Sequence, residues 1–502
     1  MSTPNPGESP RPVLTPHLLS QEDHADDYDD ETGGEYDSFL DRPFEDMSRL
    51  EQLPPEILYS IASYLSAADL TRLGATCRML ANYAMDDTLW GALVNERLPF
   101  RIEDAGSFGT FRRLYLAYHP CWFLPQHKIW FADAENTGLL VIARYDHRRG
   151  VIEACELVAD RQSSTFQVWE SNPDVIIQTF DPRVHLCSDE APAMLLQDPF
   201  VAKPALGLPS APIEAAKLTS VDRYMPLALE MQSTLYGISF CTAIDSKDLR
   251  SADDNIFWPP RTIPRCPRAI RHCKEHPLLP EDALKEKFPA TLDRMSEFHW
   301  RVTKGGARRM HTPDPRKAML TFSTLDPALY TPTKENPYQG IWVGDYSAHG
   351  CEFLLVIQRP VNEVYEDEDW MDEYYWDDSD EEDLQVIENA HEYEPNSQEI
   401  VQQGRLEAIK LTGDSNVPRG QYSFVAKDIG PGGFLRVAND EPFAGARIVR
   451  SRGHLAGRNF FDHTYINGEL ILISPDYLAH YWKEMGHISY YRRVDIDALV
   501  RP

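Results

Sequence analysis

His349 and Cys351 bring an imidazole and a thiol close together in the sequence. They stand two positions apart in an alternating segment, so they are expected to share one face of a β-strand. A thiol beside an imidazole is the pairing that activates a cysteine nucleophile. A third residue that would orient the histidine is not evident in the neighbouring sequence, so the chain is not predicted to be an enzyme.

A second group combines the residue types that hold zinc. Its members are Cys266, His272, Cys273 and His276, which His185 or Cys187 could complete. Their spacing is irregular, whereas structural zinc sites usually carry closely paired ligands. Zinc is kept as an alternative at this group, and the sequence predicts no cofactor.

Cysteine use and hydropathy bear on the compartment. The eight cysteines are scattered without a Cys-x-x-Cys pair, which favours a reducing environment over a disulfide framework. The first residues lack the apolar core of a signal peptide, and no stretch approaches the roughly 18 apolar residues of a membrane span. We expect a protein of the cytoplasm, the nucleus or both, with no membrane partner.

Most of the net charge of −30 lies in two segments. Residues 1–46 carry 13 acidic residues against Arg11 and Arg42, and residues 363–394 carry 16 acidic residues and no lysine or arginine. Dense like charge opposes ordering, so the sequence predicts a disordered tail over 1–46 and a disordered insertion over 363–397. The insertion keeps the protein soluble, docks a basic partner or is switched by phosphorylation at Ser379. Such acidity opposes phosphate, so no nucleic-acid partner is predicted.

The residues after the acidic tail have the spacing of short amphipathic helices. Pro54, Pro55 and Glu56 suit a first helical turn, where no N–H is needed and a negative charge is favourable. Aliphatic side chains then recur at helical spacing, at Ile57, Leu58, Ile61 and Leu65. Ser66 and Asp69 are expected to cap a second helix. So short a segment buries too little surface alone and needs the rest of the chain or another protein.

These helices resemble an F-box. The matching features are Leu53-Pro54, Glu56, Ile57-Leu58, Asp69-Leu70, Cys77-Arg78 and Leu89-Trp90. The resemblance implies that the helices bind a Skp1-type adaptor, which links them to a cullin scaffold, a RING subunit and a ubiquitin-charged E2. It places the adaptor face at Leu53, Pro54, Ile57, Leu58, Leu65, Leu70 and Trp90.

Short apolar runs separated by turn residues begin at Lys128 and predict antiparallel sheet. The strand pattern is interrupted by a Pro-rich segment with helical stretches and then resumes. The predicted fold is a multidomain α+β chain, with a small three-helix F-box followed by a mainly antiparallel β substrate-binding region of two barrel-like units. The predicted domains are the F-box at 47–100, a first barrel-like unit at 101–258, a connector at 259–332 and a second barrel-like unit at 333–502.

The second barrel-like unit resembles the D-type cyclin-binding domain of the F-box only protein 31 family. The matching stretches are GDYSAHGCE at 344–352, KLTGDSNVPRGQ at 410–421, GHLAGRNF at 453–460 and SYYRRVD near the C-terminus. In that family the second barrel receives an extended protein end. The resemblance makes Tyr346, His349, Lys410 and Arg419 candidates for polar contacts to such a chain end.

Together these features predict the substrate-recognition subunit of an SCF (Skp1–cullin–F-box) ubiquitin ligase. Such a subunit is not a catalyst, because it contributes by holding a substrate lysine near the E2 thioester. The alternative is an F-box protein that serves as a scaffold without ubiquitination. A scaffold would retain the adaptor and lack the cullin and RING subunits.

Overall fold

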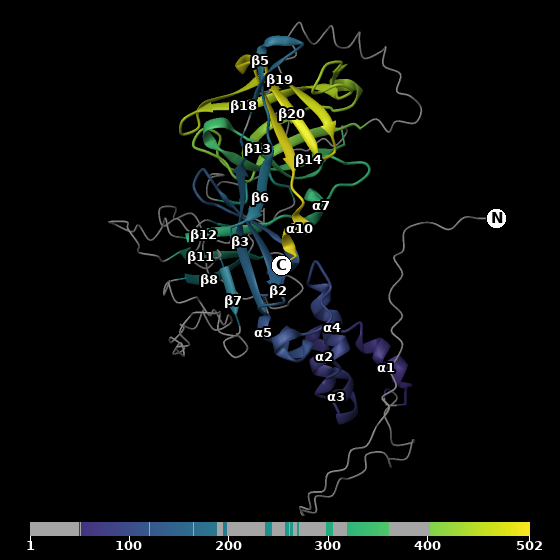
Figure 1. The fold of residues 1–502 in the computed structure, drawn as a ribbon. Coiled ribbons are helices and arrows are strands. Elements are labelled where there is room, and N and C mark those ends of the chain that lie inside the picture. The colour runs from purple at the N-terminus through teal and green to yellow at the C-terminus, as the bar shows by residue number, and fades with distance from the viewer. Residues whose placement is uncertain are drawn as a thin grey trace, which may run out of the picture. The chain divides into compact units, whose positions relative to one another are not determined.

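The computed structural model describes residues 50, 52–119, 121–163, 165–187, 194–197, 236–242, 257–260, 262–264, 269–270, 298–304, 319–360 and 402–501 (Figure 1). The chain divides after Leu58 into two units, which are described separately. The predicted acidic tail and acidic insertion lie outside the described residues. So do Cys266, His272, Cys273 and His276, the four principal residues of the alternative zinc group.

The F-box helices begin where the sequence predicts. The carbonyl of Pro54 accepts the first helical hydrogen bonds, from the N–H groups of Ile57 and Leu58 at 3.0 and 3.1 Å, so Pro55 stands at the first helical position. Ser66 caps the next helix by accepting a bond from the Asp69 N–H at 3.2 Å. The helices are α1 (Pro55–Ala62), α2 (Ala67–Gly74), α3 (Arg78–Ala84) and α4 (Asp87–Glu96).

Further helices follow before the first strand and share a core with the F-box. They are η3 (Gly106–Phe108), α5 (Phe111–Tyr118) and α6 (Phe123–His127). Trp90 of α4, Tyr115 of α5 and Trp122 belong to one buried cluster with Trp130 and Tyr145 of the first sheet. The helices from Tyr59 onward are therefore completed partly by this chain's own sheet.

The first sheet is antiparallel and has eight strands. Its order is β6-β3-β2-β1-β12-β11-β8, and β7 pairs with the other end of β3. The strands are β1 (Ile129–Ala132), β2 (Leu139–Asp146), β3 (Val151–Arg161), β6 (Pro182–Leu186), β7 (Met194–Gln197), β8 (Tyr236–Thr242), β11 (Phe298–Lys304) and β12 (Met319–Thr324). Among the strands described, no pairing closes this sheet into a barrel.

The second sheet contains a closed barrel of eight antiparallel strands (Figure 1, green to yellow). Closure comes from pairing of the first strand with the last, in which Trp342 lies opposite Arg493. The barrel strands in order are β13 (Gly340–Asp345), β14 (Cys351–Arg359), β15 (Arg405–Lys410), β16 (Tyr422–Ala426), β18 (Arg447–Gly457), β19 (Phe461–Ser474), β20 (Tyr477–Trp482) and β21 (His487–Arg493).

Three strands and several short helices extend the barrel. β17 (Phe434–Val437) pairs with β18, β5 (Asn172–Gln178) pairs in parallel with β21, and β4 (Phe166–Trp169) pairs with β5. The helices are α7 (Pro327–Tyr330), η8 (Ser347–His349), η9 (Pro431–Gly433), η10 (Lys483–Met485) and α10 (Ile496–Val500). A separate two-stranded ladder joins β9 (Phe257–Trp258) and β10 (Ala269–Ile270).

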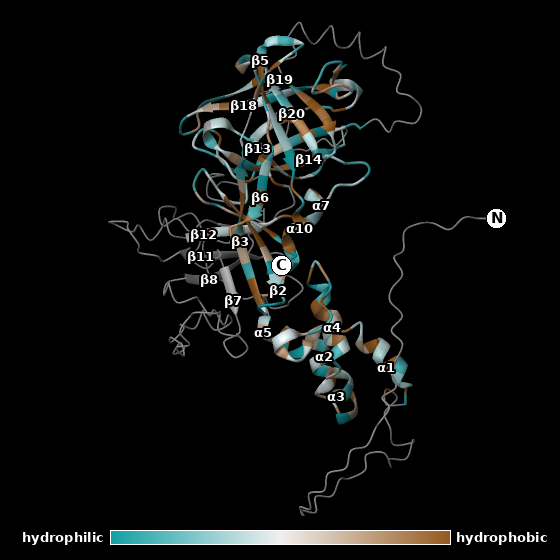
Figure 2. Cartoon of the chain, viewed as in Figure 1, coloured by the Kyte–Doolittle hydropathy of each residue, from teal (hydrophilic) through white to brown (hydrophobic). Residues whose placement is uncertain are grey.

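The barrel strands β13 to β16 are buried on both faces. Along β14, Leu354 and Val356 belong to one core cluster, whereas Phe353, Leu355 and Ile357 belong to another that includes residues of β1 and β2. The helix α10, largely hydrophobic in Figure 2, adds to the second cluster. This double burial explains why β14 is nearly continuously apolar rather than alternating.

The strand pairing differs from the predicted division at two places. The predicted connector contributes β11 and β12 to the first sheet, and β4 and β5 belong to the second sheet although they precede most of the first. Both differences arise because pairing is set by non-local contacts that local sequence patterns do not report. Among the described helices, none has the length and apolar character needed to cross a membrane.

Candidate functional site

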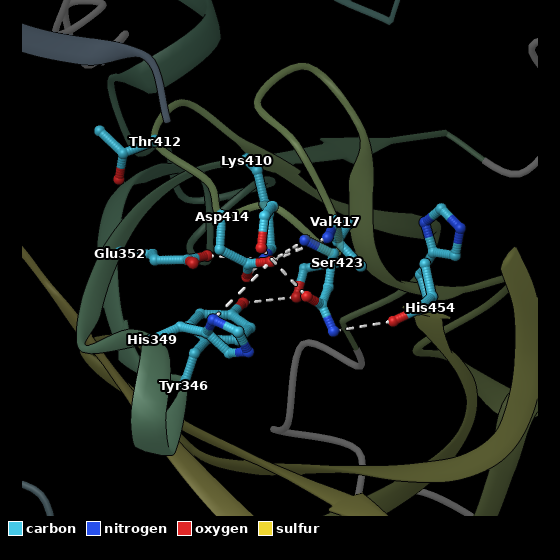
Figure 3. Close-up of polar contacts among 12 residues, drawn as sticks. Tyr346, His349, Glu352, Lys410, Thr412, Asp414, Val417, Ser423 and His454 are labelled. Atoms are coloured by element: carbon cyan, nitrogen blue, oxygen red, sulfur yellow. Dashed lines mark hydrogen bonds and ion pairs between the residues drawn. The ribbon is translucent and has the colours of Figure 1, made fainter. Parts of the chain in front are cut away.

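A polar cluster lies at one end of the barrel (Figure 3). We call it the Lys410 cluster and define it as Tyr346, His349, Glu352, Lys410, Asp414 and Ser423. Lys410 ends β15 and Glu352 lies near the start of β14; because these neighbouring strands are antiparallel, the end of one lies beside the start of the other. The loop after β15 supplies Asp414, and the turn between β13 and β14 supplies Tyr346 and His349.

Lys410 is the centre of the cluster. Its side chain is 2% exposed, and its Nζ atom lies 2.7 Å from Glu352 Oε2 and 3.0 Å from Asp414 Oδ2. The same Nζ atom lies 4.3 Å from the centre of the Tyr346 ring, a cation–π contact. The Tyr346 hydroxyl is hydrogen-bonded to that of Ser423. A buried cation with two carboxylates and an aromatic face is thus fully enclosed by protein groups.

The two carboxylates experience different environments. Burial raises the pKa of Glu352 to about 8, although Lys410 opposes the shift. Burial also disfavours the charge of Asp414, but Lys410 and the N–H of Asn416 outweigh that cost and hold its pKa at about 2. Asp414 Oδ1 also accepts a bond from the Val417 N–H at 3.0 Å. Asp414 is therefore the favoured counter-ion of Lys410, whereas burial acts against the charged form of Glu352.

His454 on β18 borders the cluster and predicts a pH dependence. Burial lowers its pKa to about 4, with the charges of His463 and Lys410 acting in the same direction and the Tyr422 carbonyl opposing. Between about pH 6.5 and pH 4 the unfolded chain binds a proton that folded His454 does not, so stability falls as the pH falls through this window.

Urea unfolding of the wild type and of His454→Gln at pH 7.5 and pH 4.5 tests this pH dependence. The unfolding midpoint of the variant should fall less between pH 7.5 and pH 4.5 than that of the wild type. Burial also lowers the pKa of His480, to about 3, which adds to the loss of stability at low pH. The raised pKa of Glu352 changes stability in the opposite direction. Both groups are present in the wild type and in the variant, so they do not affect the comparison. Equal losses would show that His454 is not responsible.

The structure brings together three of the four residues predicted to contact a chain end. Tyr346, His349 and Lys410 share the cluster, and His349, at 39% side-chain exposure, has its Nδ1 atom 4.0 Å from Asp414 Oδ1. Arg419 is directed elsewhere: it donates to the carbonyls of Ala134 and Asp133 at 2.6 and 2.7 Å. Its guanidinium also lies 4.2 Å from the centre of the Trp258 ring. Arg419 therefore joins the barrel to the loop between β1 and β2.

The expectation that His349 and Cys351 share a strand face is wrong. His349 ends the 3-10 turn η8, and Gly350, in a left-handed conformation with φ of 91°, separates it from the start of β14 at Cys351. Burial also raises the pKa of the Cys351 thiol to about 11, which disfavours the thiolate. The geometry gives no support to a cysteine nucleophile.

Glu352 and Asp414 hold Lys410 by ion pairs, and neither was among the predicted site residues, although the sequence indicated that Glu352 and His349 either hold a strand bend or line the barrel mouth. The sequence could have indicated Glu352 as a site residue, because it is an acidic residue near the start of a nearly continuous apolar strand. Asp414 was interpreted only as a turn residue, and its bonds to the N–H groups of Asn416 and Val417 confirm that role. Its second role as a counter-ion depends on a tertiary contact.

The F-box helices divide into buried and exposed apolar residues. Leu58, Leu70 and Trp90, predicted for the adaptor face, are 5%, 0% and 1% exposed. Leu53 and Leu65 are half-buried, and Pro54 is exposed. The large exposed apolar side chains of this region are Ile57, Ile61, Tyr64 and Met85. Ile57 was predicted for the adaptor face, whereas Ile61 and Tyr64 were not, and helical spacing could have indicated Ile61 as a partner of Ile57.

The described residues thus combine short capped helices that carry exposed apolar side chains with a closed barrel that has a polar cluster at one end. Comparison with known families then identifies the parts. Residues 50–96 match the F-box-like family, and residues 322–498 match the Cyclin D1 binding domain. The chain has the organisation of an F-box protein with a D-type cyclin-binding domain. The second match includes all eight strands of the barrel and the whole Lys410 cluster.

A curated relative gives a narrower comparison. The chain is 28% identical over 161 residues to Protein EXECUTER 2, chloroplastic, from Oryza sativa subsp. japonica. The match covers 32% of this chain and 21% of that protein, so it spans about a fifth of the relative's length.

Proposed function

We propose that this protein is the substrate-recognition subunit of an SCF ubiquitin ligase, acting in the cytoplasm, the nucleus or both. The observation that carries the proposal is the presence in one chain of an F-box-like domain and a Cyclin D1 binding domain. The exposed apolar residues of α1 support adaptor binding, since large exposed apolar side chains are typical of protein–protein contacts. The Skp1-type adaptor would connect the chain to cullin and RING subunits.

The barrel is proposed to bind protein substrates, with an extended chain end at the Lys410 cluster. Lys410 already has the carboxyl groups of Glu352 and Asp414 within 3.0 Å, so the cluster does not offer an isolated positive charge. His349 is the partly exposed polar member that a ligand can reach. We infer that hydrogen bonding contributes more to recognition of the end than opposite charge. The chain's own contribution to ubiquitination is proximity, because it holds substrate near the E2 thioester.

Affinity purification of the full-length chain tests the ligase proposal. We expect Skp1-type adaptor, cullin and RING subunits to be recovered in comparable amounts, and ubiquitinated substrates to accumulate with them when the proteasome is inhibited. Recovery of the adaptor without cullin or RING subunits would contradict the ligase function and favour the scaffold alternative.

A further inference from the structure

The hairpin between β18 and β19 has an unusual backbone at its tip. Asn459, Phe460 and Asp462 have φ angles of 64°, 57° and 51°, in the left-handed region that non-glycine residues seldom occupy. Such conformations cost conformational energy and persist where surrounding contacts impose them. The tip is therefore held in place by its neighbours.

Those neighbours belong to the loop of the Lys410 cluster. The N–H groups of Asn459 and Phe460 both donate to the carbonyl of Ser415, at 2.7 and 3.3 Å. Asn416 Nδ2 donates to the Ala456 carbonyl at 3.1 Å. Since Ser415 and Asn416 directly follow Asp414, the hairpin tip is fixed beside the counter-ion of Lys410.

Aromatic stacking holds the tip from its other side. The Phe460 ring is stacked on His463, with 4.6 Å between ring centres, and meets the edge of His454 at 5.6 Å. His454 is in turn bonded through Nδ1 to the Tyr422 carbonyl at 2.9 Å. Phe460 thus packs against His454 and His463, and these contacts hold the backbone next to the residue that follows.

That next residue, Phe461, is directed to solvent and is 75% exposed. A single exposed aromatic side chain is ordinary, but this one directly follows backbone that is hydrogen-bonded to the loop of the Lys410 cluster. Rigid aromatic residues lose little entropy on binding and are frequent anchors in protein interfaces.

We propose that Phe461 is a specificity-determining residue that contacts an apolar side chain of the extended protein end bound at the Lys410 cluster. The inference rests on the proposed function and adds to it a substrate class: protein ends with an apolar residue at one fixed distance from the terminus. The polar cluster would bind the chain end itself, and Phe461 would contact the apolar residue that precedes this end at the fixed distance.

Selection from random ten-residue peptides, displayed with free C-terminal ends, tests this with the full-length chain. The wild type should enrich an apolar residue at one fixed position. Phe461→Ser should lose that preference and bind the selected peptides on the order of tenfold more weakly. Phe461 is exposed, so this variant is expected to fold. Phe166→Ser is the matched control, since Phe166 is 67% exposed and lies on β4, and its selection should equal that of the wild type.

His349→Ala separates this inference from the proposed function. If His349→Ala weakens binding and Phe461→Ser retains the apolar preference, the role of Phe461 is wrong while capture of a chain end stands. If the wild type enriches no residue at a fixed distance from the peptide end, capture of the chain end is wrong and the role of Phe461 with it. Loss of the preference in Phe461→Ser alone supports the inference.

Discussion

Replacement of Lys410 by methionine is expected to lower the free energy of unfolding by about 3–5 kcal/mol, the cost typical of leaving buried charges without a partner. The methionine fills nearly the same space, but Glu352 and Asp414 then face each other in the barrel without the ammonium group that lies within 3.0 Å of both. Urea unfolding of the full-length chain, followed by barrel tryptophan fluorescence, measures the loss.

Two further variants separate charge from packing. The triple substitution Lys410→Met, Glu352→Gln and Asp414→Asn also replaces the two carboxyl groups left without the ammonium group and should recover part of the loss. Lys483→Met is the exposed control: Lys483 lies 3.5 Å from Glu469 with its side chain 34% exposed, and pairs of this kind contribute roughly 0–1 kcal/mol. Similar losses for Lys410→Met and Lys483→Met would contradict a special role for the buried ion pairs.

The helices could be predicted because their signals are local. The succession Pro54, Pro55 and Glu56, with aliphatic residues at helical spacing, indicates both where α1 begins and which side chains lie together. The strands were also recognisable as elements: the run from Lys128 becomes β1. The pairing partner of each strand could not be predicted, because pairing of Trp342 with Arg493, for example, joins residues about 150 positions apart. Local patterns do not encode such register.

In the candidate site, too, the sequence indicated individual residues but not their tertiary contacts. Tyr346, His349 and Lys410 were selected from short motifs, and the fold brings them together at one barrel end. Arg419 occurs in the same motif as Lys410, yet its guanidinium donates to the carbonyls of Asp133 and Ala134, in the loop between β1 and β2 of the first sheet. A motif fixes which residues are close in sequence, whereas the direction of each side chain depends on strand ends and loops far away. Recognition of a chain end by these residues stays a prediction.

Aspartate at Ile57 and Ile61 together is expected to weaken binding of the Skp1-type adaptor by on the order of a hundredfold or more, because charge would enter an apolar contact. The two side chains are 48% and 41% exposed and stand four positions apart on α1, which places them on the same side of that helix. Since neither is buried in the free protein, the free energy of unfolding should change by no more than about 0.5 kcal/mol. Calorimetric titration of the adaptor and urea unfolding of the full-length chain measure the two effects.

The controls distinguish an adaptor face from a merely structural helix. Leu116→Asp introduces the same charge at a side chain of α5 that is 47% exposed, and it should leave adaptor affinity unchanged. Trp90→Ala removes a ring that is 1% exposed and donates from Nε1 to the Ala84 carbonyl at 2.8 Å, so it should cost about 3–5 kcal/mol of stability. Trp90 would then support the adaptor face from beneath without contacting it. Wild-type adaptor affinity in the variant with aspartate at Ile57 and Ile61 would place the adaptor contact elsewhere. A large loss of stability in that variant would show that α1 packs within the protein. In that case α1 would not be the free face that the F-box assignment requires.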